Sequence, residues 1–209
     1  MAVTPPPPCR RASDAACLET VVDLARRCRY EQAHTHQVTR LSLALFDELA
    51  DLHGLGEDER FWLQCGAMLH DIGWCEGQKG HHKTALARIL EAEGLALHGR
   101  DRLLVANIAR YHRKALPRSA HGPFAALDAE DQRRVRVLAG ILRVCDGLDR
   151  SHSGLVRRLA CDVLPDRVVV RCEVVGPAAA EEWAAMRKAD LFEDALGRKL
   201  TIDVGSVPV

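Results

Sequence analysis

Three ionisable side chains lie on helix faces that are otherwise apolar. His34, His112 and Asp146 are each four residues from an aliphatic residue of the same predicted helix, so each shares the face that turns inward. A buried, unpaired carboxylate is costly, so Asp146 calls for a cation, a basic partner or a protonated state. A shared divalent metal ion would satisfy all three side chains.

The adjacent pair His70 and Asp71 ends another predicted helix just before Gly73, where the backbone can turn both ligands into one site. The C-terminal end of a helix carries partial negative charge, which favours a cation. Imidazole and carboxylate ligands suit Mn, Fe, Zn or Mg rather than metals that prefer sulfur. Alone, the dipeptide is better explained as a helix-end histidine with a capping aspartate; His34 and Asp146 reverse that preference and favour the metal site.

The other histidines fit such a site less clearly. His82 begins a predicted helix and His112 ends one, so each is a candidate ligand or simply a capping or hydrogen-bonded buried histidine. His36 is two residues from His34 and is expected to point away from its apolar stripe. His81, next to His82, is expected to face elsewhere. The remaining histidines lie at the edges of loops and are not expected to be metal ligands; they are His53, His98 and His121.

These residues require helices to position them, and apolar residues recur at helical spacing from about residue 14 to residue 152. The spacing predicts helices over 15–29, 31–53, 58–70, 82–93, 101–112 and 128–149. Strand-like alternation follows over 166–175, then an amphipathic helix over 178–195 and a closing strand over 199–204. The fold class is therefore mainly α: a helical bundle over 14–155 with a small C-terminal α/β appendage over 156–209, behind a disordered, proline-rich tail over 1–13.

Composition narrows the function classes. The 209 residues carry 29 Lys plus Arg and 29 Asp plus Glu, so no overall field would attract nucleic acid or an anionic membrane. Neither a signal-peptide pattern nor an apolar segment of roughly 20 residues is present, which predicts a soluble, cytoplasmic protein. The eight cysteines form no CxxC pair and are expected to be reduced and structural. Glycine motifs that cradle phosphates are absent.

The order of His34, His70–Asp71 and Asp146 along separate helices resembles the H…HD…D pattern of HD-domain phosphohydrolases. More closely, six segments look like the C-terminal half of the exopolyphosphatase and guanosine pentaphosphate phosphatase family: HTHQV (34–38), LALFDEL (43–49), MLHDIG (68–73), HHK (81–83), ARYHRK (109–114) and CDGLDRSH (145–152). The resemblance covers about residues 14–204 and includes LFEDALG (191–197) in the appendage. That family's actin-like N-terminal half, which carries its phosphate-binding loops and hydrolytic acid, has no counterpart in the sequence.

The resemblance implies an HD-domain helical bundle in which His34, His70, Asp71 and Asp146 hold a divalent metal ion. His82 and His112 match positions at which two-metal HD enzymes hold a second ion. The expected cofactor is therefore one or two ions of Mn, Mg, Fe or Zn, with Asp71 bridging or orienting at the catalytic centre.

Four basic residues lie within a few positions of these ligands, where they could hold a metal-bound phosphate: Lys83, Arg113, Lys114 and Arg150. All four are candidates for substrate binding, and Lys83, Arg113 and Arg150 also for catalysis. Alternatively, these four side chains simply belong to an ordinary solvated surface. Asp149 is a base, a partner of Arg150 or a helix-terminal charge.

Two functions fit these residues. The first is a metal-dependent phosphohydrolase that activates water against nucleotides, guanosine tetra- or pentaphosphate, or short polyphosphate. The alternative is a non-catalytic HD module that binds a phosphorylated ligand or regulates a partner protein. The unmatched N-terminal half favours the module, whereas the complete ligand set favours the enzyme. We expect a small phosphorylated ligand as the partner, no nucleic acid or membrane, and a homodimer as the candidate oligomer.

Overall fold

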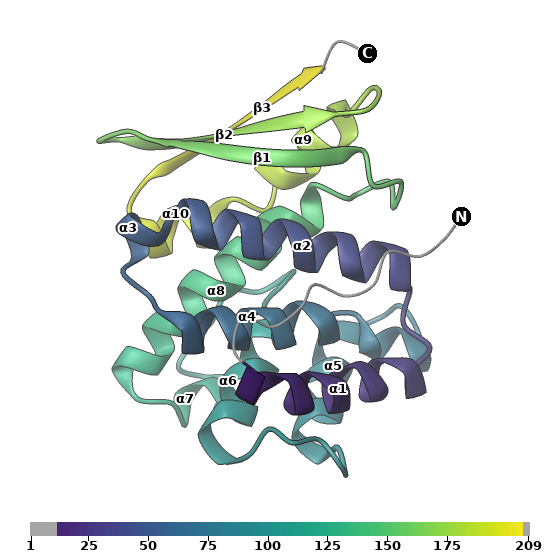
Figure 1. Ribbon diagram of the computed structural model, residues 1–209. Helices are drawn as coiled ribbons and strands as arrows, with labels where there is room; N and C mark the ends of the chain where they lie inside the picture. Colours follow the sequence, from purple (N-terminus) through teal and green to yellow (C-terminus); the bar gives the residue numbers. More distant parts are fainter. Residues whose placement is uncertain (1–11, 207–209) are drawn as a thin grey trace.

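Helices build the larger part of the fold (Figure 1), and the computed structural model describes residues 12–206. The helices before the sheet are α1 (Ala12–Arg27), α2 (Gln32–Glu48), α3 (Ala50–His53), α4 (Glu57–Leu69), the 3-10 helix η1 (Ile72–Glu76), α5 (His81–Glu91), α6 (Gly99–Arg110), α7 (Gly122–Ala125) and α8 (Ala129–Gly147). The predicted disordered tail, 1–13, lies outside the described residues except for its last two, where α1 begins.

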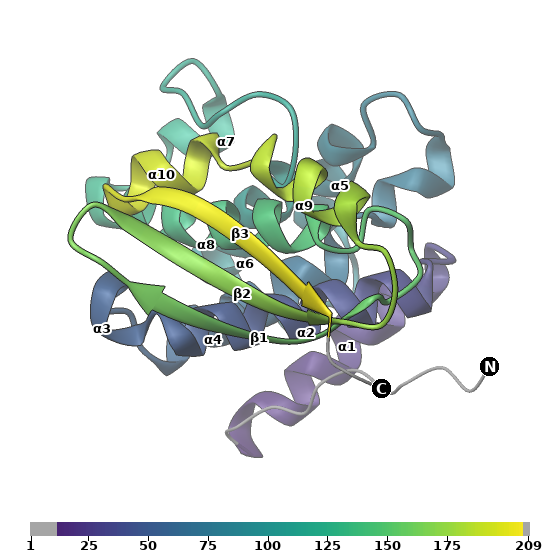
Figure 2. The same cartoon turned by 90° about the horizontal axis from the view of Figure 1, so that it is seen from above.

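The C-terminal part carries a small sheet and two further helices, so the predicted mainly α class with an α/β appendage is confirmed. Its elements are β1 (Val156–Val163), β2 (Arg167–Val174), α9 (Ala179–Met186), α10 (Asp190–Leu196) and β3 (Lys199–Ser206). The strand order is β1-β2-β3. β1 and β2 form an antiparallel hairpin, whereas β2 and β3 are parallel and joined through α9 and α10. These two helices lie between the sheet and α8 (Figure 2).

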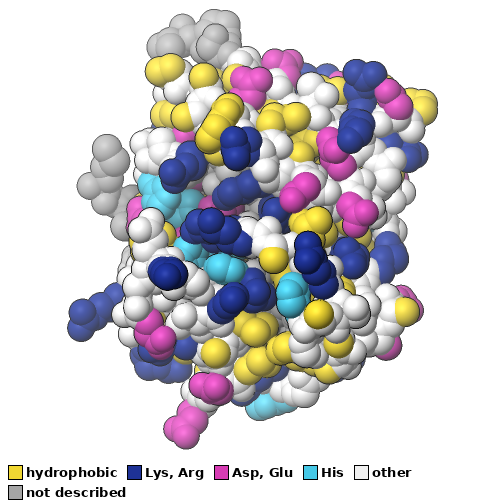
Figure 3. All heavy atoms as spheres, turned by 180° about the vertical axis from the view of Figure 1, so that it is seen from behind, with side chains coloured by type: hydrophobic (Ala, Val, Ile, Leu, Met, Phe, Trp, Pro, Cys, Tyr) yellow, Lys and Arg dark blue, Asp and Glu magenta, His cyan; other side chains and the backbone are white. Residues whose placement is uncertain are grey.

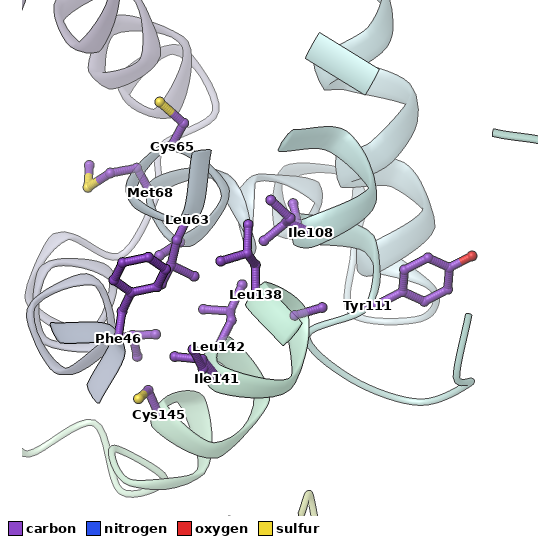
Figure 4. Close-up of a cluster of buried hydrophobic side chains, with 14 of the residues drawn as sticks. Phe46, Leu63, Cys65, Met68, Ile108, Tyr111, Leu138, Ile141, Leu142 and Cys145 are labelled. Atoms are coloured by element: carbon purple, nitrogen blue, oxygen red, sulfur yellow. The ribbon is translucent and has the colours of Figure 1, made fainter. Parts of the chain in front are cut away.

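The helical core forms where α2, α4, α6 and α8 meet (Figure 4). Leu63, Ile108 and Leu138 are fully buried there, as the helical spacing of apolar residues predicts. Gly66 lets α4 and α6 approach closely, because a Cβ at this position would lie 2.6 Å from Cγ2 of Ile108. The core thus fixes the relative positions of the helices that carry the candidate ligands.

Two predicted helices are interrupted in the structure. The helix expected over 31–53 ends at Glu48, and Leu49 joins α2 to α3 with φ −102° and ψ 12°. The helix expected over 178–195 breaks at 187–189 into α9 and α10. Both stretches keep one apolar face across the break, so periodicity alone does not reveal it.

The strand β1 was not predicted from the sequence. Only Val156 of its eight residues is buried, because β1 is an edge strand and its polar residues face solvent. Arg40 of α2 holds this strand through hydrogen bonds to the carbonyls of Val156, at 2.8 Å, and Arg157, at 2.8 Å. Those contacts attach the sheet to the helix that carries His34.

Within residues 12–206 no helix is long and apolar enough to cross a membrane. The cysteines of this part form no disulfide with one another. Most are buried or half-buried, as expected, but Cys75 is exposed.

Candidate metal centre

Two adjoining groups of ligand-type side chains lie where several helices end. The first consists of His34, His70 and Asp146, and the second of Asp71, His81 and His112. In each group the candidate ligand atoms lie within 4.8 Å of one another. The two groups therefore bring together five of the six residues predicted as metal ligands.

Helix termini position these side chains. His70 caps the C-terminus of α4, Asp71 precedes η1, and His112 follows α6. Asp146 lies in the last turn of α8. Because the C-terminal ends of helices carry partial negative charge, the convergence of α4, α6 and α8 favours a cation between them.

In the first group, two imidazole nitrogens face a carboxylate. Nε2 of His34 lies 3.4 Å from Oδ1 of Asp146. Nδ1 of His70 donates to the carbonyl of Ala67 at 2.7 Å, which leaves Nε2 facing the group. Neither Nε2 has a hydrogen-bond partner among the described residues, and both histidines are buried. Two orphaned nitrogens beside a carboxylate fit a bound divalent cation.

The second group has the same arrangement. His81 and His112 donate Nδ1–H to backbone carbonyls, at 3.0 Å and 2.8 Å respectively. Their Nε2 atoms lie 3.1 Å and 3.4 Å from Oδ1 of Asp71 and 3.4 Å from each other. Burial holds His112 neutral by lowering its pKa to about 3. The three candidate ligand atoms thus converge as the ligands of one cation would.

Asp71 connects the two groups. Its Oδ1 faces His81 and His112, whereas its Oδ2 lies 3.5 Å from Nε2 of His70 and 3.9 Å from Nε2 of His34. A carboxylate with one oxygen toward each group is the arrangement by which an aspartate can bridge two cations.

Neighbouring charges strongly shift the pKa values of the ionisable groups in the centre. Burial lowers the pKa of His34, but Asp146 and Asp149 outweigh burial and raise it to about 10. Burial alone would raise the pKa of Asp146, yet Lys188 and His34 hold it well below its usual range. The pKa of Asp71 is also well below its usual range, because His70 and His81 outweigh burial. Both carboxyl groups are therefore ionised at neutral pH, and a cation would replace the proton of His34.

Two neighbouring histidines lie differently from the prediction. His81, expected to face elsewhere, instead points at Asp71 and His112. His82 lies next to this pair, 5.9 Å from His81 between ring centroids, and is outside both groups. Burial, followed by the charges of Arg110, His81, Arg113 and Lys83, lowers the pKa of His82 to about 4.

The predicted phosphate-binding residues differ in placement. Arg113 points Nη1 at Nε2 of His81, 3.2 Å away, and lies with Lys83 in the electrostatic surroundings of His82. Lys114 and Arg150 are exposed. The backbone carbonyl of Lys114 accepts a hydrogen bond from Arg143, and the backbone N–H of Arg150 donates to the carbonyl of Gly147. On the face opposite the view of Figure 1, Lys and Arg side chains gather around histidines (Figure 3). Local positive charge thus accompanies a formal net charge of zero.

Three side chains beside the ligands make contacts that the sequence did not predict. Asp149 accepts a hydrogen bond from His34 instead of pairing with Arg150. Trp74, 44% exposed, stacks on His81 with a centroid separation of 4.9 Å. Lys188 contacts Asp146 from the turn between α9 and α10. Only Asp149 gave a sequence signal, since it follows Asp146 by three residues; Trp74 and Lys188 gave none.

Asp149 fixes the orientation and tautomer of His34. Its Oδ2 lies 2.8 Å from Nδ1 of His34, and its Oδ1 accepts the backbone N–H of Gly154 at 2.8 Å. In Asp149→Asn the amide oxygen would keep the Gly154 contact, so the amide NH2 would face Nδ1 and force the imidazole proton onto Nε2. We expect the affinity of the first group for Mn²⁺ to fall about 10- to 100-fold.

Competition with a metal-binding dye measures that loss. Asp162→Asn is the matched control, because Asp162 forms an exposed ion pair with Arg171 in the β1–β2 hairpin. An Asp149→Asn protein that binds Mn²⁺ as tightly as the unchanged chain would show that His34 needs no such partner.

Comparison with known proteins finds a matching family. The family model described as Ppx/GppA phosphatase, domain III, matches residues 18–188. The match includes both ligand groups, Asp149 and Lys188. No curated protein matches the chain.

Proposed function

The chain belongs to the Ppx/GppA phosphatase family through domain III, and on this basis we propose that it is an HD-type, metal-dependent phosphohydrolase with two cations at Asp71. The observation that carries the proposal is the pair of adjoining ligand groups, one on each oxygen of this carboxylate. When bound, divalent cations lower the pKa of water and polarise phosphoryl oxygens. Mn, Mg, Fe and Zn all suit imidazole and carboxylate ligands.

The chain's own residues prepare the centre for this chemistry. Backbone carbonyls orient His70, His81 and His112 so that each directs Nε2 inward. Asp149 does the same for His34. Because these outer hydrogen bonds are in place before a cation arrives, little reorganisation is needed on binding.

Positive side chains beside the second group support an anionic, phosphorylated substrate. Arg113 lies against His81, and the positive charges of Arg110, Arg113 and Lys83 act together to lower the pKa of His82. Arg110 is only 7% exposed, and its Nη1 has no hydrogen-bond partner among the described residues. Buried guanidinium donors of this kind fit phosphoryl oxygens.

The exposed indole of Trp74 favours a nucleotide over polyphosphate. His112, His81 and Trp74 form a stack that runs from the buried second group to the surface, with centroid separations of 5.4 Å and 4.9 Å. A nucleobase that stacked on the indole would leave its phosphates close to the positive side chains.

We therefore expect Trp74→Ala to lower kcat/KM for a nucleoside triphosphate about tenfold, since stacking on an aromatic side chain contributes roughly 1–3 kcal/mol per base. Hydrolysis of tripolyphosphate, which has no base, should change less than about twofold. Trp183→Ala is the control, because Trp183 is 60% exposed on α9 and interacts with Arg187. Equal losses on both substrates would remove the argument for a nucleotide.

The alternative function is a non-catalytic module, and the match to a single domain of the phosphatase family favours it. A single assay distinguishes this module from the enzyme. The protein is stripped with a chelator, reloaded with Mn²⁺, Mg²⁺, Fe²⁺ or Zn²⁺, and incubated with nucleotides, guanosine tetraphosphate and tripolyphosphate. The enzyme releases phosphate only after reloading. Stoichiometric metal binding with no release from any compound would identify the module instead.

A further inference from the structure

A lysine from the C-terminal appendage reaches one of the candidate ligands. Nζ of Lys188 is hydrogen-bonded to Oδ2 of Asp146, while Oδ1 of the same carboxylate faces His34. The Lys188 side chain is 25% exposed and that of Asp146 13% exposed. The ammonium group thus lies at the open edge of the first group, beside the position that a cation would occupy.

Close packing of the appendage against α8 brings Lys188 to this position. Gly147 faces Ala185 so closely that a Cβ would lie 2.5 Å from its Cα, and Gly140, two helical turns earlier, faces Phe192 at 3.0 Å. α8 therefore presents two glycines to the backbones of α9 and α10. A side chain at either glycine would push the turn that carries Lys188 away from Asp146.

Buried polar contacts fasten the same junction. Arg143 of α8, whose side chain is 4% exposed, donates to Asp190 at 2.8 Å. Glu181 of α9, 1% exposed, accepts the backbone N–H of Ser151 at 3.0 Å. Charged groups this deeply buried hold their partners in a defined arrangement. Lys188 therefore lies in a segment of the appendage that is held firmly against α8, next to the centre.

We propose that Lys188 is a substrate-binding residue that neutralises Asp146 in the metal-free chain and binds phosphoryl oxygens in the metal-loaded chain. A divalent cation on Asp146 repels the adjacent ammonium group. The four-carbon stem of lysine lets its head move while the backbone stays fixed, and the open edge is where a phosphoryl group would approach. This inference rests on the proposed function.

The proposal requires opposite effects on two affinities. In Lys188→Met a competitor for Asp146 disappears, so Mn²⁺ should bind the first group about tenfold more tightly. Orthophosphate, used as the probe, should bind the Mn²⁺-loaded protein about tenfold more weakly, because a charge-assisted hydrogen bond is lost. Lys188→Arg should restore phosphate binding to within about threefold.

Calorimetric titrations of the full chain measure both affinities without turnover. Arg187→Met is the matched control, since the Arg187 guanidinium lies over the Trp183 ring, 4.8 Å from its centroid, and should leave both affinities unchanged. If Lys188→Met weakened Mn²⁺ and phosphate binding together, Lys188 would be structural only and the proposal would fail. Unchanged phosphate binding would also overturn it.

The proposed function fails separately. A wild-type chain that bound Mn²⁺ and orthophosphate but hydrolysed no compound would contradict the phosphohydrolase. Opposite changes in the two affinities of Lys188→Met would still support Lys188 as a phosphate-binding residue of a non-catalytic centre.

Discussion

Replacing Asp71 with asparagine should abolish tight metal binding in both ligand groups and reduce phosphate release by at least about a hundredfold. The amide keeps the shape of the carboxylate but loses the charge that each group shares through Oδ1 and Oδ2. A neutral amide is a weak ligand for a divalent cation, so two sites fail from one substitution. Elemental analysis after gel filtration and initial rates of phosphate release measure the two effects.

Asp166→Asn is the control for this substitution, because Asp166 is exposed and pairs with its neighbour Arg167 in the hairpin. It should retain the metal content and the rate of the unchanged chain. If Asp71→Asn lost one ion and kept the other, Asp71 would belong to a single group and would not bridge.

The second large effect concerns Gly73, where η1 packs against α5. A Cβ at this glycine would lie 2.0 Å from the carbonyl oxygen of His81 and 2.8 Å from the backbone nitrogen of Ala85. Backbone atoms cannot move aside as a flexible side chain can, so Gly73→Ala must shift the first turn of α5. We expect the free energy of unfolding to fall by about 1–3 kcal/mol.

The same substitution should weaken the second ligand group, because the shifted turn carries His81. Urea unfolding and Mn²⁺ titration measure the two losses. Gly122→Ala is the matched control: Gly122 begins α7, and a Cβ there would meet no atom within 4 Å. It should change stability by less than about 0.5 kcal/mol. A Gly73→Ala protein as stable as this control, with full metal binding, would show that the η1–α5 contact does not position His81.

Local sequence patterns predicted the longer helices and two of the strands because each carries its own periodicity, whereas the short helices η1 and α7 were not predicted. They also distinguished His34 from His36: His34 lies in the centre, whereas His36, though buried, hydrogen-bonds to Tyr30 at 2.8 Å. Asp146 is only half-buried, but its Oδ1 faces His34 at 3.4 Å.

Features that depend on distant contacts could not be predicted in this way. His81 and His82 are consecutive residues at the start of α5, and only the packing of η1 against α5 decides which one faces Asp71. Lys188 lies 42 residues from Asp146 and reaches it because two glycines of α8 admit the appendage.

The proposed function requires the two groups around Asp71 to hold two divalent cations. Titration of the metal-free chain with Mn²⁺, followed by electron paramagnetic resonance, tests this most directly. We predict two ions per chain with an exchange-coupled spectrum, since ions that share a carboxylate lie about 3.5–4 Å apart. A single ion with an uncoupled spectrum, or no tightly bound Mn²⁺, would rule out a two-cation centre at Asp71.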